Sequence, residues 1–527
     1  MRWVALLKRA ALLGWVALLG SVAAACPAAL AGGPLPPATP EGRIEPVAGR
    51  GPPGQGLPPD FAAALERAGV KPQQISIWFG EADSAEARFH WLPETPRNPA
   101  SVLKLVTTAQ ALDQLGPGYR WTTTVWAEGP LQPARCRRTG AAARCRAPGD
   151  TLDGRLLLSG GGDPRLRRED LRALFAQVRA AGIRHIRGDI ELDRSAFALP
   201  PHDAGAFDGQ PQRAYNVGAD ALLVDFAALS VQARADGDRP PQAWLEPALD
   251  GVALDNRLRA GAGACTDWRL RPLMRIETAP ATAAAGEPEV RVTLEGEMPA
   301  SCDAASIDIA PLTAAEYTRR AVRQAWREAG GSLSGTVGEG VARYGMRSVG
   351  EWRSPPLADL VRDVNRFSNN VMAEHLWLTA GAATSGWPAT REKATAATLE
   401  WLRGAGAADA ETLIDSGAGL SRRTRVTAQQ LHAVLRHMAG TPLFPEFAAS
   451  LPIAGEDGTA GRVRVRAHAR LKTGSLNGVR AAAGYVRDGS GRWLSLVVLV
   501  EDAPTDGWRE LLAWLVERAA ATEGPVP

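Results

Sequence analysis

The chain has two segments of mixed helical and strand pattern, and a long segment rich in short strand patterns separates them. The first mixed segment ends with a helical pattern at residues 98–116, and helical patterns return at residues 312–333. The region between, from about residue 130 to 310, is rich in Gly, Pro and Arg, with short strand patterns such as 188–193 and 289–299. It is too long for a loop. The sequence therefore predicts one α/β domain that is split by a separately folding, β-rich insertion.

The two outer segments supply the elements of this split domain. Before the insertion, residues 60–70 have helical spacing and residues 75–82 alternate as in a strand. After it, two strong strand patterns at residues 481–488 and 493–502 precede a final helical pattern at 507–521. These elements are therefore expected to belong to the same α/β domain.

Length and charge narrow the class of protein. A chain of 527 residues exceeds what one hydrophobic core supports, so two to four domains are expected. Hydrophobic residues make up 45% and charged residues 22%, as in soluble globular proteins. The formal net charge is +3, and no cluster of Lys and Arg coincides with an aromatic motif. A nucleic-acid partner is therefore not expected.

The N-terminus has the pattern of an export signal. Basic residues precede an apolar stretch at residues 10–25, and an A-x-A cleavage site ends at Ala31. We therefore expect residues 1–31 to be a cleaved signal peptide, followed by a disordered leader at residues 32–58 that is rich in Pro and Gly. An uncleaved membrane anchor and a lipoprotein signal that ends at Cys26 are the alternatives.

The remaining cysteines agree with export. Cys136 and Cys145 lie nine residues apart, and Cys265 and Cys302 lie 37 apart. An oxidising compartment favours disulfides, and of the three possible connectivities we favour the local one. Four unpaired thiols are the alternative. A zinc site is not expected, because no CxxC motif occurs and the seven histidines are scattered.

Ser101 and Lys104 lie about one turn apart on the predicted helix at residues 98–116. A serine hydroxyl is a weak nucleophile that needs a base. Lysine acts as that base when burial and a neighbouring positive charge lower its pKa. Ser-x-x-Lys also occurs by chance in many proteins, so an ordinary surface or core helix is the alternative.

Two further short motifs with Ser, Asn and Lys residues follow later in the sequence. Residues 368–370 form a Ser-x-Asn at the junction of two helical segments. Residues 472–474 form a Lys-Thr-Gly, followed by Ser475, just before the strand pattern at 481–488. Ser-x-x-Lys, Ser-x-Asn and Lys-Thr-Gly in this order are the motif set of penicillin-binding proteins and serine β-lactamases.

With these motifs the chain resembles the low-molecular-mass class C penicillin-binding proteins, the exported D-alanyl-D-alanine carboxypeptidases and endopeptidases that trim peptidoglycan. The resemblance covers most of residues 60–510. Beyond the three motifs, four segments are similar to family segments: "LLLSGGGDPRL" (156–166), "GDIELDRSAF" (188–197), "DSGAGLSRRTRVTAQQL" (415–431) and "LPIAGEDGTAGR" (451–462). Ser101 and Ser368 are 267 positions apart, whereas the first two motifs are much closer in compact serine β-lactamases.

The resemblance implies a fold of the α/β (α+β) class. It is a serine β-lactamase/transpeptidase-like domain, an antiparallel sheet with helices on both faces, split by a two-part β-rich insertion. It also implies a disulfide between Cys265 and Cys302 inside that insertion. The expected parts are transpeptidase-like residues 59–120 and 311–527, inserted domain II at 121–205 and 263–310, and a nested small domain III at 206–262.

The resemblance also implies catalytic roles. Ser101 attacks the carbonyl carbon of the penultimate D-alanine and forms an acyl-enzyme, while Lys104 takes its proton. Lys472 supplies positive charge that keeps the Lys104 pKa low and attracts the substrate carboxylate. Ser368 relays a proton to the leaving amine, and Asn370 orients Lys104 and a substrate amide. No separate glutamate motif is present to act as a deacylation base, so Lys104 is expected to serve again.

Further residues are expected at the substrate. Backbone N–H groups of Ser101 and Ser475 would form the oxyanion hole. The substrate-binding set implied by the resemblance is Thr473, Gly474, Ser475, Asp193, Phe197, Arg422 and Asn477. Asp193 would meet the free amine of a diamino acid in the stem peptide, with Phe197 nearby. A plain strand-end or turn carboxylate is the alternative for Asp193.

The expected function is that of a periplasmic serine D,D-peptidase, acting as carboxypeptidase, endopeptidase or both, without metal or other cofactor. Its partners would be stem peptides ending in D-Ala-D-Ala, D,D-cross-links and β-lactams, which would acylate Ser101. A homodimer is compatible with the family. A β-lactamase is one alternative, which the long insertion and the missing deacylation glutamate disfavour. A non-catalytic wall-binding protein is another, which the intact motif set disfavours.

Overall fold

The computed structural model describes residues 57–132, 136–139, 142–145, 150–265, 273–279, 288–504 and 506–521. The predicted signal peptide with Ala31, the alternative lipoprotein Cys26 and nearly all of the leader lie outside these residues. Within the described ranges, no helix is long and apolar enough to cross a membrane.

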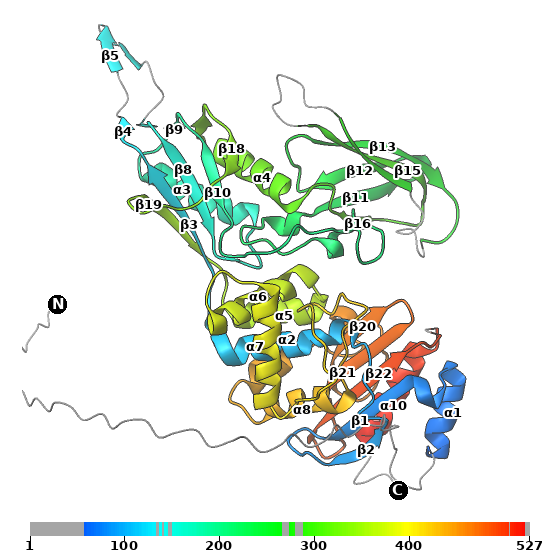
Figure 1. The fold of residues 1–527 in the computed structure, drawn as a ribbon. Coiled ribbons are helices and arrows are strands. Elements are labelled where there is room, and N and C mark those ends of the chain that lie inside the picture. Colours follow the sequence, from blue (N-terminus) through cyan, green and yellow to red (C-terminus); the bar gives the residue numbers. More distant parts are fainter. Residues whose placement is uncertain are drawn as a thin grey trace, which may run out of the picture. The chain divides into compact units, whose positions relative to one another are not determined.

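One sheet contains strands from both the N-terminal and the C-terminal part of the described chain (Figure 1). Among the described residues it has five antiparallel strands in the order β2-β1-β22-β21-β20. The strands are β1 (Ile75–Glu81), β2 (Ala87–Trp91), β20 (Ala469–Leu476), β21 (Val479–Arg487) and β22 (Trp493–Glu501). Strands β21 and β22 are almost continuously buried, because helices cover the sheet on both faces. In the strand order given above, β20 is the last strand and lies at one edge of the sheet.

The two faces of this sheet pack against different helices. Helices α1 (Pro59–Ala68) and α10 (Trp508–Ala521) pack on one face, where Phe61 and Leu512 share a core with Val498. The other face holds a larger helical layer. Its members are α2 (Lys104–Leu115), α5 (Leu357–Phe367), α6 (Asn370–Ser385), α7 (Arg391–Gly404), α8 (Ala428–Ala439) and α9 (Phe444–Ser450). An antiparallel sheet with helices on both faces is the predicted fold, and it is confirmed.

A second set of sheets forms the insertion (Figure 1). In the described part of the chain, a mixed five-stranded sheet has the order β18-β10-β8-β3-β19. Its strands are β3 (Thr122–Glu128), β8 (Arg155–Gly160), β10 (Ile190–Asp193), β18 (Val337–Glu339) and β19 (Arg347–Arg353). Helices α3 (Arg168–Ala180) and α4 (Ala314–Glu328) pack together beside it. Short strands β4 (Leu131–Gln132), β7 (Thr151–Leu152), β9 (His185–Ile186) and β17 (Ser332–Leu333) form a further sheet.

Two small sheets lie between β10 and α4 in sequence. The described strands pair in the orders β12-β11-β16 and β13-β15-β14. They are β11 (Leu229–Asp236), β12 (Arg239–Glu246), β13 (Val252–Gly261), β14 (Leu273–Thr278), β15 (Val290–Pro299) and β16 (Ala305–Ile309). Strands β5 (Cys136–Thr139) and β6 (Ala142–Cys145) form a separate hairpin.

The strand pairings bear on the expected domain boundaries. Strands β18 and β19 follow residue 310, yet they pair with β10 and β3 of the insertion. Strands β14 to β16 lie within residues 263–310. Strand β15 pairs with β14 and with β13 of the expected domain III, and β16 pairs with β11 of that domain. The domain division stays a proposal. These pairings would extend inserted domain II to Arg353 and enlarge nested domain III to Ile309, because hydrogen-bonded strands belong to one folding unit.

Candidate active site

Ser101 lies in a tight turn rather than in a regular α-helix. Residues Ala100–Leu103 form a 3-10 turn, and α2 begins at Lys104. Ala100 has a positive φ of 46°, and its N–H donates to the Asn98 side-chain oxygen at 2.8 Å. The Asn98 amide also donates to the Ser421 carbonyl at 2.8 Å. The predicted helix at 98–116 therefore differs at its start, because Asn98 shapes a strained turn there.

The Lys104 side chain is completely buried and surrounded by acceptors. Its Nζ lies 2.9 Å from Ser101 Oγ, 2.8 Å from Asn370 Oδ1 and 2.6 Å from the Ala418 carbonyl oxygen. A neutral amine has two hydrogens and one lone pair. Asn370 and Ala418 can take the two hydrogens, and the lone pair then faces the Ser101 hydroxyl. The geometry therefore suits proton transfer from serine to lysine.

The electrostatics of the site favour neutral Lys104. Burial lowers the Lys104 pKa well below its usual value, and the positive charge of Lys472 lowers it further, while the negative charge of Glu374 raises it. Burial also lowers the pKa of Lys472, to about 7. Two ammonium groups in one buried site repel each other, which favours deprotonation of one of them.

The Ser-x-Asn motif is the joint between two helices. Ser368 ends α5 in the left-handed conformation, with φ 59°. Asn369 caps α6, its side-chain oxygen accepting the Met372 N–H at 3.0 Å. Asn370 begins α6, and its amide donates to the Tyr215 carbonyl of the insertion at 3.0 Å. Each residue of the motif thus has a structural role, and the turn between the two helices places the side chains of Ser368 and Asn370 at the site.

Lys472 connects the edge strand to this joint. Its Nζ donates to Ser368 Oγ at 3.0 Å and to the Thr473 carbonyl at 2.8 Å. Gly474 follows at the closest approach of β20 to the nucleophile turn. A Cβ at Gly474 would lie 2.7 Å from the Pro99 oxygen and 3.0 Å from the Ser101 nitrogen. Only glycine allows this approach.

A cleft of about 720 Å³ opens at Ser101. Its lining includes Ser368, Thr473, Gly474 and Ser475, together with residues of η6 (Gly458–Ala460) and of the start of α10. The Thr473 hydroxyl donates to the Thr459 hydroxyl at 2.8 Å. The structure therefore brings the three motifs together at one cleft.

The predicted specificity residue Asp193 lies elsewhere. It ends β10 and is 3% exposed. Its carboxylate accepts the Ser195 and Ala342 N–H groups, each at 2.9 Å. Burial raises the pKa of this carboxyl, but hydrogen bonds from Ser195 and Ala342 outweigh it, and the pKa is lowered. Asp193 does not line the cleft at Ser101, and its contacts are those of a strand-end carboxylate.

The other predicted substrate contacts lie in two separate places. Arg422 and Asn477 meet each other, the guanidinium donating to the Asn477 carbonyl at 3.0 Å. Arg422 also lies over the Phe207 ring, 5.2 Å from its centroid. Neither Arg422 nor Asn477 lines the cleft at Ser101. Phe197 packs edge-on against His375, with ring centroids 5.4 Å apart.

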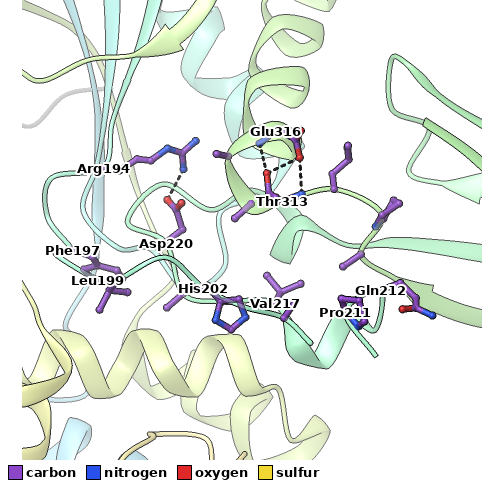
Figure 2. A pocket seen from close by; sticks show the side chains of 18 of the residues that line it. Arg194, Phe197, Leu199, His202, Pro211, Gln212, Val217, Asp220, Thr313 and Glu316 are labelled. Atoms are coloured by element: carbon purple, nitrogen blue, oxygen red, sulfur yellow. Dashed lines mark hydrogen bonds and ion pairs between the residues drawn. The ribbon is translucent and has the colours of Figure 1, made fainter. Parts of the chain in front are cut away.

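Phe197 lines a second cavity of about 810 Å³ (Figure 2). Apolar side chains such as Leu199 and Val217 form much of its wall. Figure 2 also shows the Arg194–Asp220 ion pair and the Thr313–Glu316 capping contacts at this cavity. No residue of the three motifs lines it.

Glu374 lies near the site but outside the three motifs. It lies four positions after Asn370 on α6 and contacts Ser416 and Ala418 beside Lys104. The i,i+4 spacing from the Ser-x-Asn motif places it on the same helix face. That spacing is a signal by which the sequence could have revealed it.

The cysteines of the second expected pair are bonded to each other. Cys265 and Cys302 form a disulfide, as the resemblance implied. Cys136 and Cys145 are register partners on the β5–β6 hairpin, while their side chains lie outside the described part, so their pairing stays a prediction. No cluster of three or more His, Cys, Asp or Glu side chains able to hold a metal occurs among the described residues.

Comparison with known proteins agrees with the geometry. The profile of the D-Ala-D-Ala carboxypeptidase 3 (S13) family matches residues 60–520. The D-alanyl-D-alanine carboxypeptidase of Actinomadura sp. is 30% identical over 417 residues, which are 74% of this chain and 70% of that protein. The carboxypeptidase DacB of Mycolicibacterium smegmatis is 28% identical over 497 residues, covering 90% and 86% of the two chains.

The fold has a solved counterpart. The crystal structure of penicillin binding protein 4 (dacB) from Haemophilus influenzae superposes with a TM-score of 0.68 at 19% identity, covering 88% of this chain and all of that one. The same protein has been solved in complex with a β-lactam, with a TM-score of 0.65 to this chain.

The fold and the site define a low-molecular-mass class C penicillin-binding protein, a serine-type D-Ala-D-Ala carboxypeptidase. The chain belongs to the D-Ala-D-Ala carboxypeptidase 3 (S13) family.

Proposed function

We propose that this enzyme cleaves the bond after the penultimate D-alanine of peptidoglycan stem peptides through an acyl-enzyme on Ser101. The observation that carries the proposal is the buried Lys104 Nζ, 2.9 Å from Ser101 Oγ. The same chemistry serves a terminal D-Ala-D-Ala and a D,D-cross-link, because both present an amide after D-alanine.

In acylation, neutral Lys104 takes the Ser101 proton while Ser101 Oγ bonds to the carbonyl carbon. Asn370 Oδ1 and the Ala418 carbonyl accept the two amine hydrogens of Lys104, so that the lone pair of the amine points at the Ser101 hydroxyl. The developing oxyanion accepts the backbone N–H groups of Ser101 and Ser475. Each such donor is worth about 2.7–4 kcal/mol in other hydrolases.

The tetrahedral intermediate then collapses and the C–N bond breaks. The leaving amine takes a proton from Lys104 through the Ser368 hydroxyl, which Lys472 Nζ contacts at 3.0 Å. Charged Lys472 attracts the carboxylate of the leaving D-alanine, and Thr473 and Ser475 bind the same end of the substrate. With Lys472 charged, Lys104 remains the neutral member of the pair.

Deacylation reverses these steps with water in place of the leaving amine. Lys104 again takes the proton, water bonds to the acyl carbon, and Ser101 leaves with a proton restored. Asp506, just before α10, and Glu510, in its first turn, line the cleft, and both are exposed. Their exposure makes them poor candidates for a tuned base.

The location and the remaining partners belong to the same proposal. The signal pattern that ends at Ala31 supports export to the periplasm, where peptidoglycan lies. β-Lactams resemble acyl-D-Ala-D-Ala and would acylate Ser101. The substrate contacts expected of Asp193, Phe197, Arg422 and Asn477 stay predictions. Asp193 itself is 3% exposed, and its carboxylate already accepts the Ser195 and Ala342 N–H groups.

The test is intact-mass analysis of the secreted chain incubated with benzylpenicillin, beside Ser101→Ala and the exposed control Ser385→Ala. We expect a persistent adduct in the native chain and the control, and none in Ser101→Ala. An adduct on Ser101→Ala, or none on the native chain, would contradict the nucleophile assignment. A transient adduct with rapid loss of penicillin would favour a β-lactamase.

A further inference from the structure

Glu374 is a buried acid that the mechanism above does not use. It lies on α6 and is 8% exposed. Its Oε1 accepts the hydroxyl of Ser416 and the N–H of Ala418, the latter at 3.2 Å. The carbonyl of the same Ala418 accepts Lys104 Nζ at 2.6 Å. One residue therefore connects the carboxylate to the amine, its N–H bonded to the one and its C=O to the other.

The segment around Ala418 is tightly packed. A Cβ at Gly417 would lie 2.4 Å from Trp377 Cβ, and one at Gly419 would lie 2.0 Å from the Ala100 carbonyl. Thr107 Oγ1 donates to the Gly417 carbonyl at 2.6 Å. The segment is thus held between α6, α2 and the nucleophile turn, and a small shift of Ala418 would move the acceptor of Lys104.

Two basic side chains interact with Glu374. Its negative charge acts on Lys104 of α2, on which the positive charge of Lys472 of β20 also acts, and Arg391 Nη1 on α7 is 3.6 Å from Glu374 Oε2. Among the described residues, Oε2 has no hydrogen-bond partner. The negative charge of Glu374 raises the Lys104 pKa, against the lowering by burial and by Lys472.

We propose that Glu374 is a positioning residue for Lys104: its carboxylate holds the Ser416–Ala418 segment that presents a carbonyl to the amine, and its charge counters that of Lys472. The proposal rests on the role of Lys104 as the base for Ser101. It assigns Glu374 two separable effects, one through hydrogen bonds and one through charge.

Glu374→Gln separates the two effects. The amide oxygen of glutamine can accept both the Ser416 hydroxyl and the Ala418 N–H, so the segment keeps its anchor while the charge is lost. Without the negative charge, protonated Lys104 is less stable and its pKa falls. The neutral amine then exists at lower pH, and the acidic limb of the acylation profile moves to lower pH by about one unit.

The experiment measures the second-order rate constant for acylation by benzylpenicillin from pH 5 to 10, with Ser101→Ala as the blank. Glu374→Gln should shift the acidic limb to lower pH. Ser416→Ala keeps the charge, so its limb should stay in place while the plateau rate falls. Glu374→Ala should show both effects, with a plateau loss of about tenfold. Glu392→Gln, which replaces an exposed acid of α7, controls for the loss of a surface charge.

Three outcomes decide the matter. A limb shift in Glu374→Gln that Glu392→Gln and Ser416→Ala lack would support the proposal. An unmoved limb in a Glu374→Gln enzyme that still acylates Ser101 would overturn it and leave the proposed function intact. If benzylpenicillin does not acylate the native enzyme, or acylates Ser101→Ala as fast as the native enzyme, the proposed function itself is overturned.

Discussion

Ser368 combines a functional hydroxyl with an unfavourable backbone. Its φ of 59° lies in the left-handed region, which costs an ordinary L-residue about 1–2 kcal/mol. Ser368 directly follows the last residue of α5, and α6 begins two positions after Ser368. Glycine would suit the turn better, but it would remove the hydroxyl that Lys472 Nζ contacts. The site therefore retains strain at a residue where the chemistry needs an oxygen.

Replacing Ser368 tests this balance. Both Ser368→Ala and Ser368→Gly lose the hydroxyl, and we expect both to be acylated by benzylpenicillin at least about tenfold more slowly than the native chain. The glycine variant should be more stable than the alanine variant by about 1 kcal/mol, because glycine adopts a positive φ freely. Denaturant titration followed by tryptophan fluorescence measures the difference. Equal stability of the two variants would show that the left-handed conformation carries no strain.

At the scale of elements, the edge strand β20 and the nucleophile turn form one unit. Strand β20 pairs with β21 over Ala469–Leu476, with Lys472 opposite Ala483 and Gly474 opposite Ala481. This register brings Gly474 against Pro99 and the Ser101 nitrogen. A side chain at this position would separate the strand from the turn and move the two proposed oxyanion donors apart.

Gly474→Ala should therefore reduce acylation far more than stability. Its Cβ would meet the Pro99 oxygen at 2.7 Å, and a displacement of about 1 Å at a catalytic group costs on the order of 10²-fold in rate. The control is Gly489→Ala in the β21–β22 turn, where no atom lies within 4 Å of the added Cβ. Penicillin acylation rates for the two variants give the comparison. A Gly474→Ala rate within twofold of the control would contradict the close approach.

At the scale of the whole molecule, the catalytic domain is assembled across the insertion. Lys104 contacts Asn370 and Ala418, which lie 266 and 314 positions further along the chain. The insertion touches this assembly through specific hydrogen bonds. The Tyr215 carbonyl accepts the Asn370 amide, and the Gly162 carbonyl accepts a ring nitrogen of His375 at 2.9 Å. Insertion and catalytic helices are therefore connected next to the site.

The Cys265–Cys302 disulfide lies in the insertion and not at the cleft. It closes a loop of 37 positions, so its removal should destabilise the insertion by about 4 kcal/mol. We expect the double variant Cys265→Ser/Cys302→Ser to show a lower unfolding transition in calorimetry. Its acylation rate by benzylpenicillin at 25 °C should stay within twofold of the native rate. Loss of acylation below the new transition would show instead that the insertion supports the catalytic geometry.

Much of the fold and site could be predicted from local signals. Alternation at residues 75–82 and the apolar runs near the C-terminus correspond to strands β1, β21 and β22 of one sheet. The three motifs meet at one cleft. The domain division stays a prediction. Strands β18 and β19 follow residue 310 and pair with the insertion, but they are short and have little periodicity of their own. The role expected of Asp193 also stays a prediction. One of its hydrogen-bond donors is Ala342, 149 positions further along the chain, which no local pattern indicates.

The sequence by itself determined the order of the elements, the split of the catalytic domain and the identity of the motif residues. These depend on periodicity, spacing and side-chain chemistry, which are local properties of a chain. Only the tertiary structure decided that Lys104 is completely buried and shares its surroundings with Lys472, Asn370, Ala418 and Glu374. The pKa of an amine depends on burial and on neighbouring charges. These neighbours lie hundreds of positions away in sequence, and only folding brings them within reach of the amine.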